Sequence, residues 1–315
     1  MRMARDAAHR ARRLSWETAG WRDDRVPRLM GILNINADSF SDPREATCVR
    51  SDVTWLIRQG ARLWQAGADA VDVGAESASP ATPVVDARAE IDALLPVLDG
   101  LHSSGVTTSV DTYKPTVARA CVAAGVAVIN DYSGLAHPEV AGICAEGGAR
   151  LVLTHNPTGV KKKVLDPRAY TDIMDEMAAW FEAKLAVIAA HGLAPEHVLL
   201  DPGIDLAKTP AQSIDVFRGL NALTRYELPL LVAISRKDFI GAVSRSDPAD
   251  RDPGTLAALA HLIGLPRVIA RVHDVAAARQ FLDVADILAD RTPVARTLTL
   301  PRTLRRAKAA SDTAG

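Results

Sequence analysis

The segment TTSVDTYKPTVARACVAAGVAVIND, residues 107–131, contains the alternation that decides the fold. It begins with a short apolar run that ends on Asp111, and it finishes with a second apolar run that reaches Asn130. Between the runs, Pro115 stands where the first turn of a helix would begin and Gly125 where the helix would end, which are positions that these residues favour. The segment therefore predicts a strand, a helix and a second strand, the repeating unit of parallel sheets.

The same alternation continues along the chain. Eight apolar runs, rich in Val, Ile and Leu, are RLMGILN (28–34), DAVDVG (69–74), TTSVD (107–111), VAVIND (126–131), ARLVLTH (149–155), HVLLDPG (197–203), PLLVAIS (229–235) and VIARVHD (268–274). The segments with helical spacing are residues 52–67, 86–101, 114–125, 137–148, 169–192, 211–226, 252–264 and 274–290. Eight strand–helix units predict an α/β fold, a closed (β/α)8 TIM barrel in a single domain. An open doubly wound sheet is the alternative, but it would carry a glycine-rich phosphate loop, and neither GxGxxG nor GxxxxGK occurs.

Composition limits the organisation and the partners of the chain. We expect the barrel to occupy residues 27–290, between an N-terminal extension (1–26) that lacks the apolar segment of a secretory signal and a C-terminal tail (291–315). No apolar stretch is long enough to cross a membrane, and a net charge of −1 argues against a nucleic-acid-binding domain. Three cysteines without CxxC spacing are expected to be free thiols, which is typical of the cytoplasm.

Almost every apolar run ends in a polar or charged residue. Barrels of parallel strands build their active sites at the carboxyl ends of the strands, so these residues are predicted to form one site. In chain order they are Asn34, Asp72, Asp111, Asn130, Asp131, His155, Asp201, Ser235, Arg236, Lys237, Arg271 and His273, with Asp38, Asp42, Ser77 and Ser79 in the first two loops.

The carboxylates and the amide at Asp111, Asn130 and Asp201 would suit a flat heterocycle rich in N–H donors. Such a group must be hydrogen-bonded on every edge when it is buried. Structural interpretations stay open: Asp111 could cap a helix, and Asp201 could begin a turn. His155 could be a hydrogen-bonded core histidine, and Asp72 could hold neighbouring loops together.

Cationic residues at the last strand ends predict an anion site beside this pocket. Lys237, Arg271 and His273 would form an electropositive rim, because Arg matches phosphate oxygens and His adds a further donor. Asn34 and Asp42 offer the hard oxygen ligands that Mg²⁺ prefers beside a pyrophosphate. The sequence thus predicts a heterocycle deep in the barrel with a phosphate group toward its mouth.

Several motifs together resemble one family. MGILNINADSFSD, DVGAESASP, SVDTYKP, VIND, LLDPG, SRKDFIG and RVHDV, in this order and spacing, resemble dihydropteroate synthase over about residues 28–290. The resemblance implies a barrel that usually forms homodimers. It also implies condensation of 6-hydroxymethyl-7,8-dihydropterin pyrophosphate with p-aminobenzoate, with release of pyrophosphate, in folate biosynthesis.

The resemblance also implies roles for individual residues. The pterin-binding set comprises Asp111, Asn130, Asp201 and Lys237. The pyrophosphate-binding set comprises Asn34, Arg271 and His273, with Mg²⁺ at Asn34 and Asp42. The acceptor-side set comprises Ser77, Ser79, Ser235 and Arg236. The residues expected to be catalytic are Asp111, which would stabilise the cation that develops on the pterin, and Lys237, Arg271 and His273.

The chain departs from the common family pattern in the loops around the acceptor. Ser79 replaces a usual Arg, as in the sulfonamide-insensitive branch of the family, and the first loop reads Ser41-Asp42-Pro43-Arg44 instead of SDGG. Three alternatives therefore stay open beside dihydropteroate synthesis. They are a related pterin alkyltransferase that uses another amine or nucleophile, a pterin-binding protein without turnover, and methyl transfer to a corrinoid partner.

Overall fold

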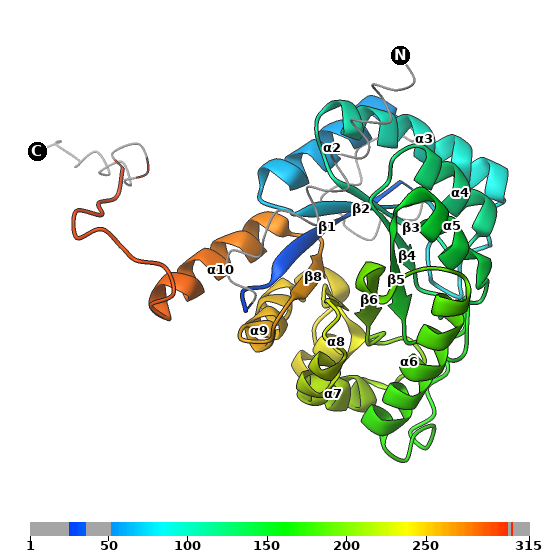
Figure 1. Cartoon of the computed structure of the whole chain (residues 1–315). Helices are drawn as coiled ribbons and strands as arrows, with labels where there is room; N and C mark the ends of the chain where they lie inside the picture. The colour runs from blue at the N-terminus through cyan, green and yellow to red at the C-terminus, as the bar shows by residue number, and fades with distance from the viewer. Residues whose placement is uncertain (1–24, 36–51, 302–303, 305–315) are drawn as a thin grey trace, which may run out of the picture.

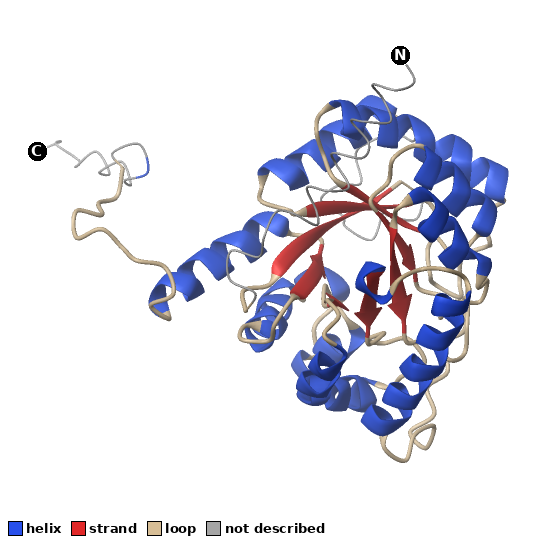
Figure 2. Cartoon of the chain, viewed as in Figure 1, coloured by secondary structure: helices blue, strands red, loops and turns tan. Residues whose placement is uncertain are grey.

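Eight parallel strands close into a barrel in the order β1 to β8, and each strand pairs with the next one along the chain. The structure is a computed structural model, and it describes residues 25–35, 52–301 and 304. Helices surround the strands on the outside (Figure 1), so that the strands occupy the centre of the molecule (Figure 2). The predicted (β/α)8 architecture is confirmed.

The elements follow the predicted order. The strands are β1 (Arg28–Asn34), β2 (Ala70–Gly74), β3 (Thr108–Asp111), β4 (Val128–Asp131), β5 (Arg150–Thr154), β6 (Val198–Asp201), β7 (Leu230–Ala233) and β8 (Val268–Val272). The α-helices are α2 (Val53–Gln65), α3 (Ala87–Ser103), α4 (Pro115–Ala123), α5 (Glu139–Gly147), α6 (Ile173–Ala190), α7 (Pro210–Gly219), α8 (Asp238–Ser244), α9 (Asp252–Leu262) and α10 (Val275–Leu288). Short 3₁₀ helices are η2 (Pro195–His197), η3 (Leu220–Tyr226) and η4 (Pro248–Asp250).

The helices begin where the sequence supplies a side chain that can cap them. Asp52, Asp86, Asp172 and Asp274 each accept a hydrogen bond from a backbone N–H in the first turn of α2, α3, α6 and α10. Thr209 and Gln212 form a reciprocal capping box at the start of α7. Such caps satisfy amide groups that a helix leaves unpaired at its first turn.

Two helical segments differ from the prediction. Residues 211–226 do not form one helix, because α7 ends at Gly219 and the chain continues as η3. Helix α8, which directly follows Lys237, was not predicted. Its seven residues complete only two turns, too few for a helical spacing of apolar residues to be recognised.

An apolar layer fills the barrel beneath the strand ends. It consists of Met30, Ala70, Ala127, Val128, Val152, Leu199, Leu231 and Ile269. Side chains two residues apart on a strand share a face. The residues two positions after Ala70, Val128, Leu199 and Ile269 are Asp72, Asn130, Asp201 and Arg271. The polar site residues therefore lie in the next layer of the barrel interior, on an apolar floor.

The segments outside the barrel add little to this arrangement. The predicted extension (1–26) lies outside the described residues apart from Arg25 and Val26, and residues 291–301 contain no helix or strand. Figure 1 shows residues 291–301 running away from the barrel beyond the end of α10. Within the described ranges, no helix combines the length and apolar character that a membrane span needs.

Candidate active site

A buried set of polar side chains joins β2, β3, β4 and β8 at the carboxyl end of the barrel. We name Asp72, Asp111, Asn130 and Arg271 the strand-end network. Arg271 Nε donates to Asp72 Oδ2 at 2.6 Å, and Arg271 Nη2 donates to Asp111 Oδ2 at 3.1 Å. Asn130 Nδ2 donates to Asp72 Oδ2 at 2.9 Å. One guanidinium thus holds two carboxylates, and Asp72 lies at the centre of the site.

The strand-end network leaves two oxygen atoms unused. Asp72 Oδ1 and Asp111 Oδ1 are buried and have no hydrogen-bond partner among the described residues. A buried acceptor without a partner costs roughly 1–3 kcal/mol, and more when it is charged. These two oxygens are therefore positioned to accept hydrogen bonds from a ligand that enters the barrel.

Electrostatics in the network favour an easily protonated Asp111. Burial raises the pKa of Asp111 to about 7, although the positive charge of Arg271 opposes that shift. Burial also disfavours the charge of Arg271, but Asp72 and Asp111 outweigh it and raise the pKa of Arg271. Arg271 therefore remains a cation, while Asp111 can change its protonation near neutral pH.

Asp201 lies at the end of β6 beside two lysines. Its Oδ1 accepts a hydrogen bond from the backbone N–H of Gly203 at 2.7 Å. Burial raises the pKa of Asp201, against the charges of Lys237 and Lys208. Lys237 Nζ donates to the carbonyl oxygen of Ile204 at 2.9 Å, which directs its ammonium group to the loop that follows Asp201.

Gly203 allows this loop to turn tightly behind Asp201. Its backbone has φ 65°, in the left-handed region that favours glycine. A Cβ at this position would lie 2.2 Å from the carbonyl oxygen of His155. The Asp-Pro-Gly motif of residues 201–203 is therefore a turn, and the same turn aims the Asp201 carboxylate.

His273 and Ser235 lie together at the ends of β8 and β7. The Nδ1 atom of His273 is 2.8 Å from Ser235 Oγ. Burial, helped by the charges of Arg271 and Arg236, lowers the pKa of His273 to about 4. The imidazole is therefore neutral at neutral pH, and it adds a hydrogen-bonding group to the predicted electropositive rim without adding a charge.

Arg236, one of the predicted acceptor-side residues, forms an ion pair with the acidic residue Asp252. Its Nε and Nη2 donate to the carboxylate of Asp252 at 2.9 and 3.1 Å. Arg236 thereby attaches the end of β7 to the first turn of α9. Ser77 and Ser79 lie in the loop after β2, where each hydroxyl accepts a backbone N–H from within the loop at 3.2 Å.

The predicted magnesium ligands are only partly described. A Cβ placed at Gly74 would lie 3.4 Å from the Cβ of Asp111 and 3.9 Å from Asn34 Oδ1, so the Asn34 amide lies beside the strand-end network. Asp42 falls outside the described residues. Within those residues, no group of three or more His, Cys, Asp or Glu could hold a metal ion. Mg²⁺ usually keeps several waters and is bound through one or two carboxylates and substrate phosphates, and the Asn34 amide is the only one of the two predicted ligands that the structure describes.

Two site residues were not proposed from the sequence. Lys208 is 1% exposed, and its ammonium donates to the carbonyl oxygens of His155, Gly203 and Leu206 at 2.9–3.1 Å. Burial lowers the pKa of Lys208 to about 7, although Asp201 opposes this. A lysine seven residues after the aspartate of a DPG turn was the available signal.

Tyr132 is the second residue that sequence reasoning missed. Its hydroxyl is buried without a hydrogen-bond partner in the described part of the chain. Burial and the nearby carboxylate of Asp111 raise the pKa of Tyr132. Its position directly after the polar end of β4 was the only indication. His155, in contrast, packs against the rings of Trp180 and Phe181. Its Nδ1 is buried without a hydrogen-bond partner among the described residues, so the alternative of a hydrogen-bonded core histidine is not borne out.

Comparison with known proteins agrees with this geometry. Residues 30–273 match the family of pterin binding enzymes. The dihydropteroate synthase of Synechocystis is 36% identical over 82% of this chain and 89% of its own length. The type-3 dihydropteroate synthase of Escherichia coli is 31% identical over 84% of this chain and 100% of its own length.

A solved structure extends the likeness to three dimensions. The dihydropteroate synthase of Xanthomonas albilineans with 4-aminobenzoic acid superposes with a TM-score of 0.76 at 32% identity, and the match covers 86% of this chain and 95% of that one. The strand-end network, the barrel that carries it and these relatives lead to one conclusion. The chain belongs to the pterin-binding enzyme family, as a transferase of the dihydropteroate synthase type.

Proposed function

We propose that this protein condenses 6-hydroxymethyl-7,8-dihydropterin pyrophosphate with p-aminobenzoate and releases pyrophosphate. The observation that carries the proposal is the pair of buried, unpartnered oxygens on Asp72 and Asp111, which a single guanidinium holds in place. A pterin presents several N–H donors on one edge, and acceptors of this kind would satisfy them. The match to relatives named dihydropteroate synthase supports the same reaction.

The pterin would lie on the apolar floor of the barrel. Three strands supply the polar groups for the ring, which are Asp111, Asn130 and Asp201. Together they can form hydrogen bonds with more than one edge of a flat ring. Lys237 approaches from the loop after β7. Because hydrogen bonds from side chains and backbone already hold these groups in place, little reorganisation is needed when the ligand binds.

The pyrophosphate would lie toward the mouth, between Asn34, Arg271 and His273. Arg271 supplies a permanent positive charge, and neutral His273 supplies a hydrogen bond. Asn34, together with Asp42, would hold Mg²⁺. When bound, the ion would offset negative charge on the departing pyrophosphate.

The bond changes balance without a covalent enzyme intermediate. The amine nitrogen donates its lone pair to the methylene carbon of the pterin. The bond from that carbon to the pyrophosphate oxygen breaks, and its electron pair leaves with the oxygen. The amine then loses a proton to solvent. A carboxylate at Asp111, beside the pterin, stabilises the positive charge that develops on the ring as the bond breaks.

A product assay tests the proposal. The protein is incubated with the pterin pyrophosphate, Mg²⁺ and p-aminobenzoate, beside a panel of other amines, and dihydropteroate and pyrophosphate are quantified. We expect equal amounts of both products with p-aminobenzoate. Turnover only with another amine would assign the chain to a related alkyltransferase, and pterin binding without pyrophosphate release would make it a binding protein.

We further propose a homodimer located in the cytoplasm, with residues 27–290 as the catalytic unit and residues 1–26 and 291–315 as appended segments. The family resemblance supports the dimer, and the free cysteines Cys121 and Cys144, both buried, are compatible with a reducing compartment. Sedimentation of the full-length protein would test the dimer. Truncation to residues 27–290 with retained turnover would test the domain boundaries.

A further inference from the structure

The loop between β2 and α3, residues 75–86, begins directly at the wall of the site. It follows Gly74, where a Cβ would meet the Cβ of Asp111 at 3.4 Å. Beyond the buried residues Ala75 and Glu76, the loop is mostly exposed to solvent. A loop with few buried apolar contacts depends on polar contacts for its position. The contacts that fix this loop therefore decide where its serines lie.

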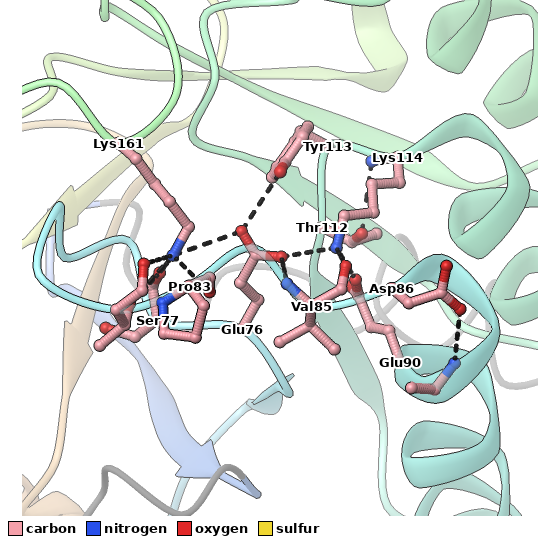
Figure 3. Close-up of polar contacts among 12 residues, drawn as sticks. Glu76, Ser77, Pro83, Val85, Asp86, Glu90, Thr112, Tyr113, Lys114 and Lys161 are labelled. Atoms are coloured by element: carbon pink, nitrogen blue, oxygen red, sulfur yellow. Dashed lines mark hydrogen bonds and ion pairs between the residues drawn. The ribbon is translucent and has the colours of Figure 1, made fainter.

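Lys161 provides most of the contacts between this loop and the rest of the barrel mouth. Its ammonium group lies 2.7 Å from the carbonyl oxygen of Ser77 and 2.9 Å from Thr82 Oγ1. It also donates to the carbonyl oxygens of Thr82 at 3.1 Å and Pro83 at 3.2 Å, and it lies 3.6 Å from Glu76 Oε1. Figure 3 shows Lys161 reaching these groups from above the loop.

Lys161 reaches the loop across the rim of the barrel. It belongs to the segment after β5, whereas the loop follows β2, so the link spans β3 and β4. The side chain is only 10% exposed. Lys161 also adopts a left-handed backbone conformation, with φ 52°, which is unfavourable for a residue with a Cβ. The contacts of the ammonium group offset this cost.

Glu76 connects the contacts of Lys161 to a rigid part of the barrel. Its carboxylate accepts hydrogen bonds from Lys114 Nζ at 2.5 Å, Val85 N at 2.9 Å and Tyr113 Oη at 3.2 Å. Burial opposes the charge of Glu76, but Lys114, the Val85 N–H and Lys161 outweigh it, so its pKa lies below the ordinary value.

A second carboxylate completes the arrangement (Figure 3). Lys114 Nζ lies 2.5 Å from Glu90 Oε2, in the first turn of α3. We name Glu76, Glu90, Lys114 and Lys161 the loop clamp. It contains two carboxylates and two ammonium groups, and none of its side-chain nitrogen or oxygen atoms is buried without a partner among the described residues.

We propose that Lys161 is a positioning residue for the second substrate: it holds the 75–86 loop, and with it Ser77 and Ser79, against the barrel mouth where the amine acceptor enters. For the identity of the acceptor, this inference rests on the proposed function. The ammonium group of Lys161 contacts groups of the 75–86 loop and none of the residues of the strand-end network. It acts through the backbone of Ser77, Thr82 and Pro83, which it fixes from one point.

Amide hydrogen exchange tests the positioning role without requiring turnover. Lys161→Met removes the ammonium group and keeps the length of the side chain. We expect exchange of the amides of residues 77–82 to accelerate about tenfold or more, because hydrogen bonds to a charged group are lost. Exchange in β3 should stay unchanged. Lys162→Met, at the neighbouring exposed residue, removes the same charge and should leave the loop as it is.

Steady-state kinetics with both substrates test whether the position of the loop affects binding of the acceptor. Lys161→Met should raise the KM for p-aminobenzoate about tenfold and leave the KM for the pterin pyrophosphate within about twofold. Lys161→Arg should keep the KM for p-aminobenzoate close to the wild-type value, because a guanidinium can reach several of the same carbonyl oxygens. Unchanged loop exchange in Lys161→Met would overturn the proposal, and so would an equal rise of both KM values.

A milder variant keeps the proposal testable if Lys161→Met does not fold. Thr82→Val preserves the shape of the side chain and removes one acceptor of Lys161, together with the hydrogen bonds that Thr82 Oγ1 donates to the carbonyl oxygens of Ser79 and Ser77. It should accelerate loop exchange in the same direction by a smaller factor, and an unchanged rate would contradict the proposal. If the protein makes no dihydropteroate, the kinetic test fails together with the proposed function, whereas the exchange test still decides whether Lys161 holds the loop.

Discussion

The strand-end network and the loop clamp are both buried clusters of opposite charges, and they differ in how completely their atoms are paired. The strand-end network has two carboxylates for one guanidinium, and two of its oxygens have no partner in the described part of the protein. The loop clamp balances two carboxylates with two ammonium groups. Buried polar groups are normally paired. The two unpaired oxygens of the strand-end network can accept hydrogen bonds from a ligand, whereas the loop clamp has its charges paired and holds the loop.

This difference also assigns the two clusters to different substrates. The strand-end network lies in the barrel interior, beneath the mouth, where a heterocycle would be buried. The loop clamp lies along the rim, where a second substrate would approach. Variants in the first cluster should therefore impair pterin or pyrophosphate binding, and variants in the second should impair acceptor binding.

The largest effect is expected for Arg271→Met. Without the guanidinium, Asp72 would lose its buried counter-charge, which typically costs about 3–5 kcal/mol of folding stability, and the pKa of Asp111 would rise further because the charge that lowers it is gone. Turnover should fall at least about 1,000-fold, since the charge facing the pyrophosphate is also lost. Urea unfolding and steady-state kinetics would measure the two effects.

Direct binding measurements sharpen this prediction. Arg271→Met should weaken binding of the pterin pyrophosphate much more than binding of a pterin without the pyrophosphate. Some loss is expected for both, because Arg271 also holds Asp111. Equal weakening of the two ligands would contradict the assignment of Arg271 to the pyrophosphate.

The strand-end network, and Asp201 beside it, were largely predictable from the sequence, for a physical reason. The period of two along a strand and the shared direction of parallel strands determine which residues meet at the carboxyl end. Asp111, Asn130, Asp201 and Arg271 all follow from that rule. The hydrogen bonds between these residues could not be predicted in this way. A strand pattern shows that Arg271 faces inward, but it does not show that Arg271 joins Asp72 to Asp111.

The loop clamp could not be predicted in the same way. Lys161 and Glu76 are 85 positions apart in the sequence, and irregular loops lack a period that fixes the direction of a side chain. Lys161 itself has a left-handed backbone conformation. Its ammonium group binds Thr82, which lies 79 positions earlier in the sequence. Such contacts arise only once the barrel has closed.

Asp201→Asn should have the next largest effect, on pterin binding. An amide keeps one acceptor, which can still receive the N–H of Gly203, but its NH₂ group would face ligand donors that a carboxylate accepts. We expect pterin affinity to fall about 10- to 100-fold, as for loss of a hydrogen bond to a charged group. Calorimetric titration with a free pterin would measure it. Unchanged affinity, with unfolding like that of the wild type, would remove Asp201 from the pterin site.

Asp111→Asn should change the dependence of stability on pH. Because burial raises the pKa of Asp111 from 3.8 to about 7, the folded protein keeps a proton in this range that the unfolded chain releases. The contribution of Asp111 to stability therefore falls as pH rises from about 4 to about 7, by up to about 1.4 kcal/mol per pH unit.

The titration of His273 changes folding stability with pH in the direction opposite to that of Asp111. The wild type must therefore be compared with a variant that lacks the Asp111 carboxyl group. The pKa of His273 is lowered from 6.5 to about 4, so its contribution to stability rises with pH between those values. Subtracting the urea-unfolding profile of Asp111→Asn from that of the wild type isolates the carboxyl group. A difference that stayed constant from pH 4 to pH 7 would show that the Asp111 carboxyl does not titrate in this window.

The smallest effects are expected for Ser77→Ala and Ser79→Ala. Each hydroxyl accepts one loop amide at 3.2 Å near solvent, and a hydrogen bond of this kind contributes about 0.5–1.5 kcal/mol. The KM for p-aminobenzoate should rise by no more than about fivefold in either variant, less than in Lys161→Met. If Ser79→Ala raised the KM for p-aminobenzoate more than Lys161→Met does, the order of the two effects would be reversed. The Ser79 hydroxyl would then bind the acceptor directly, and holding the loop in place would not be enough.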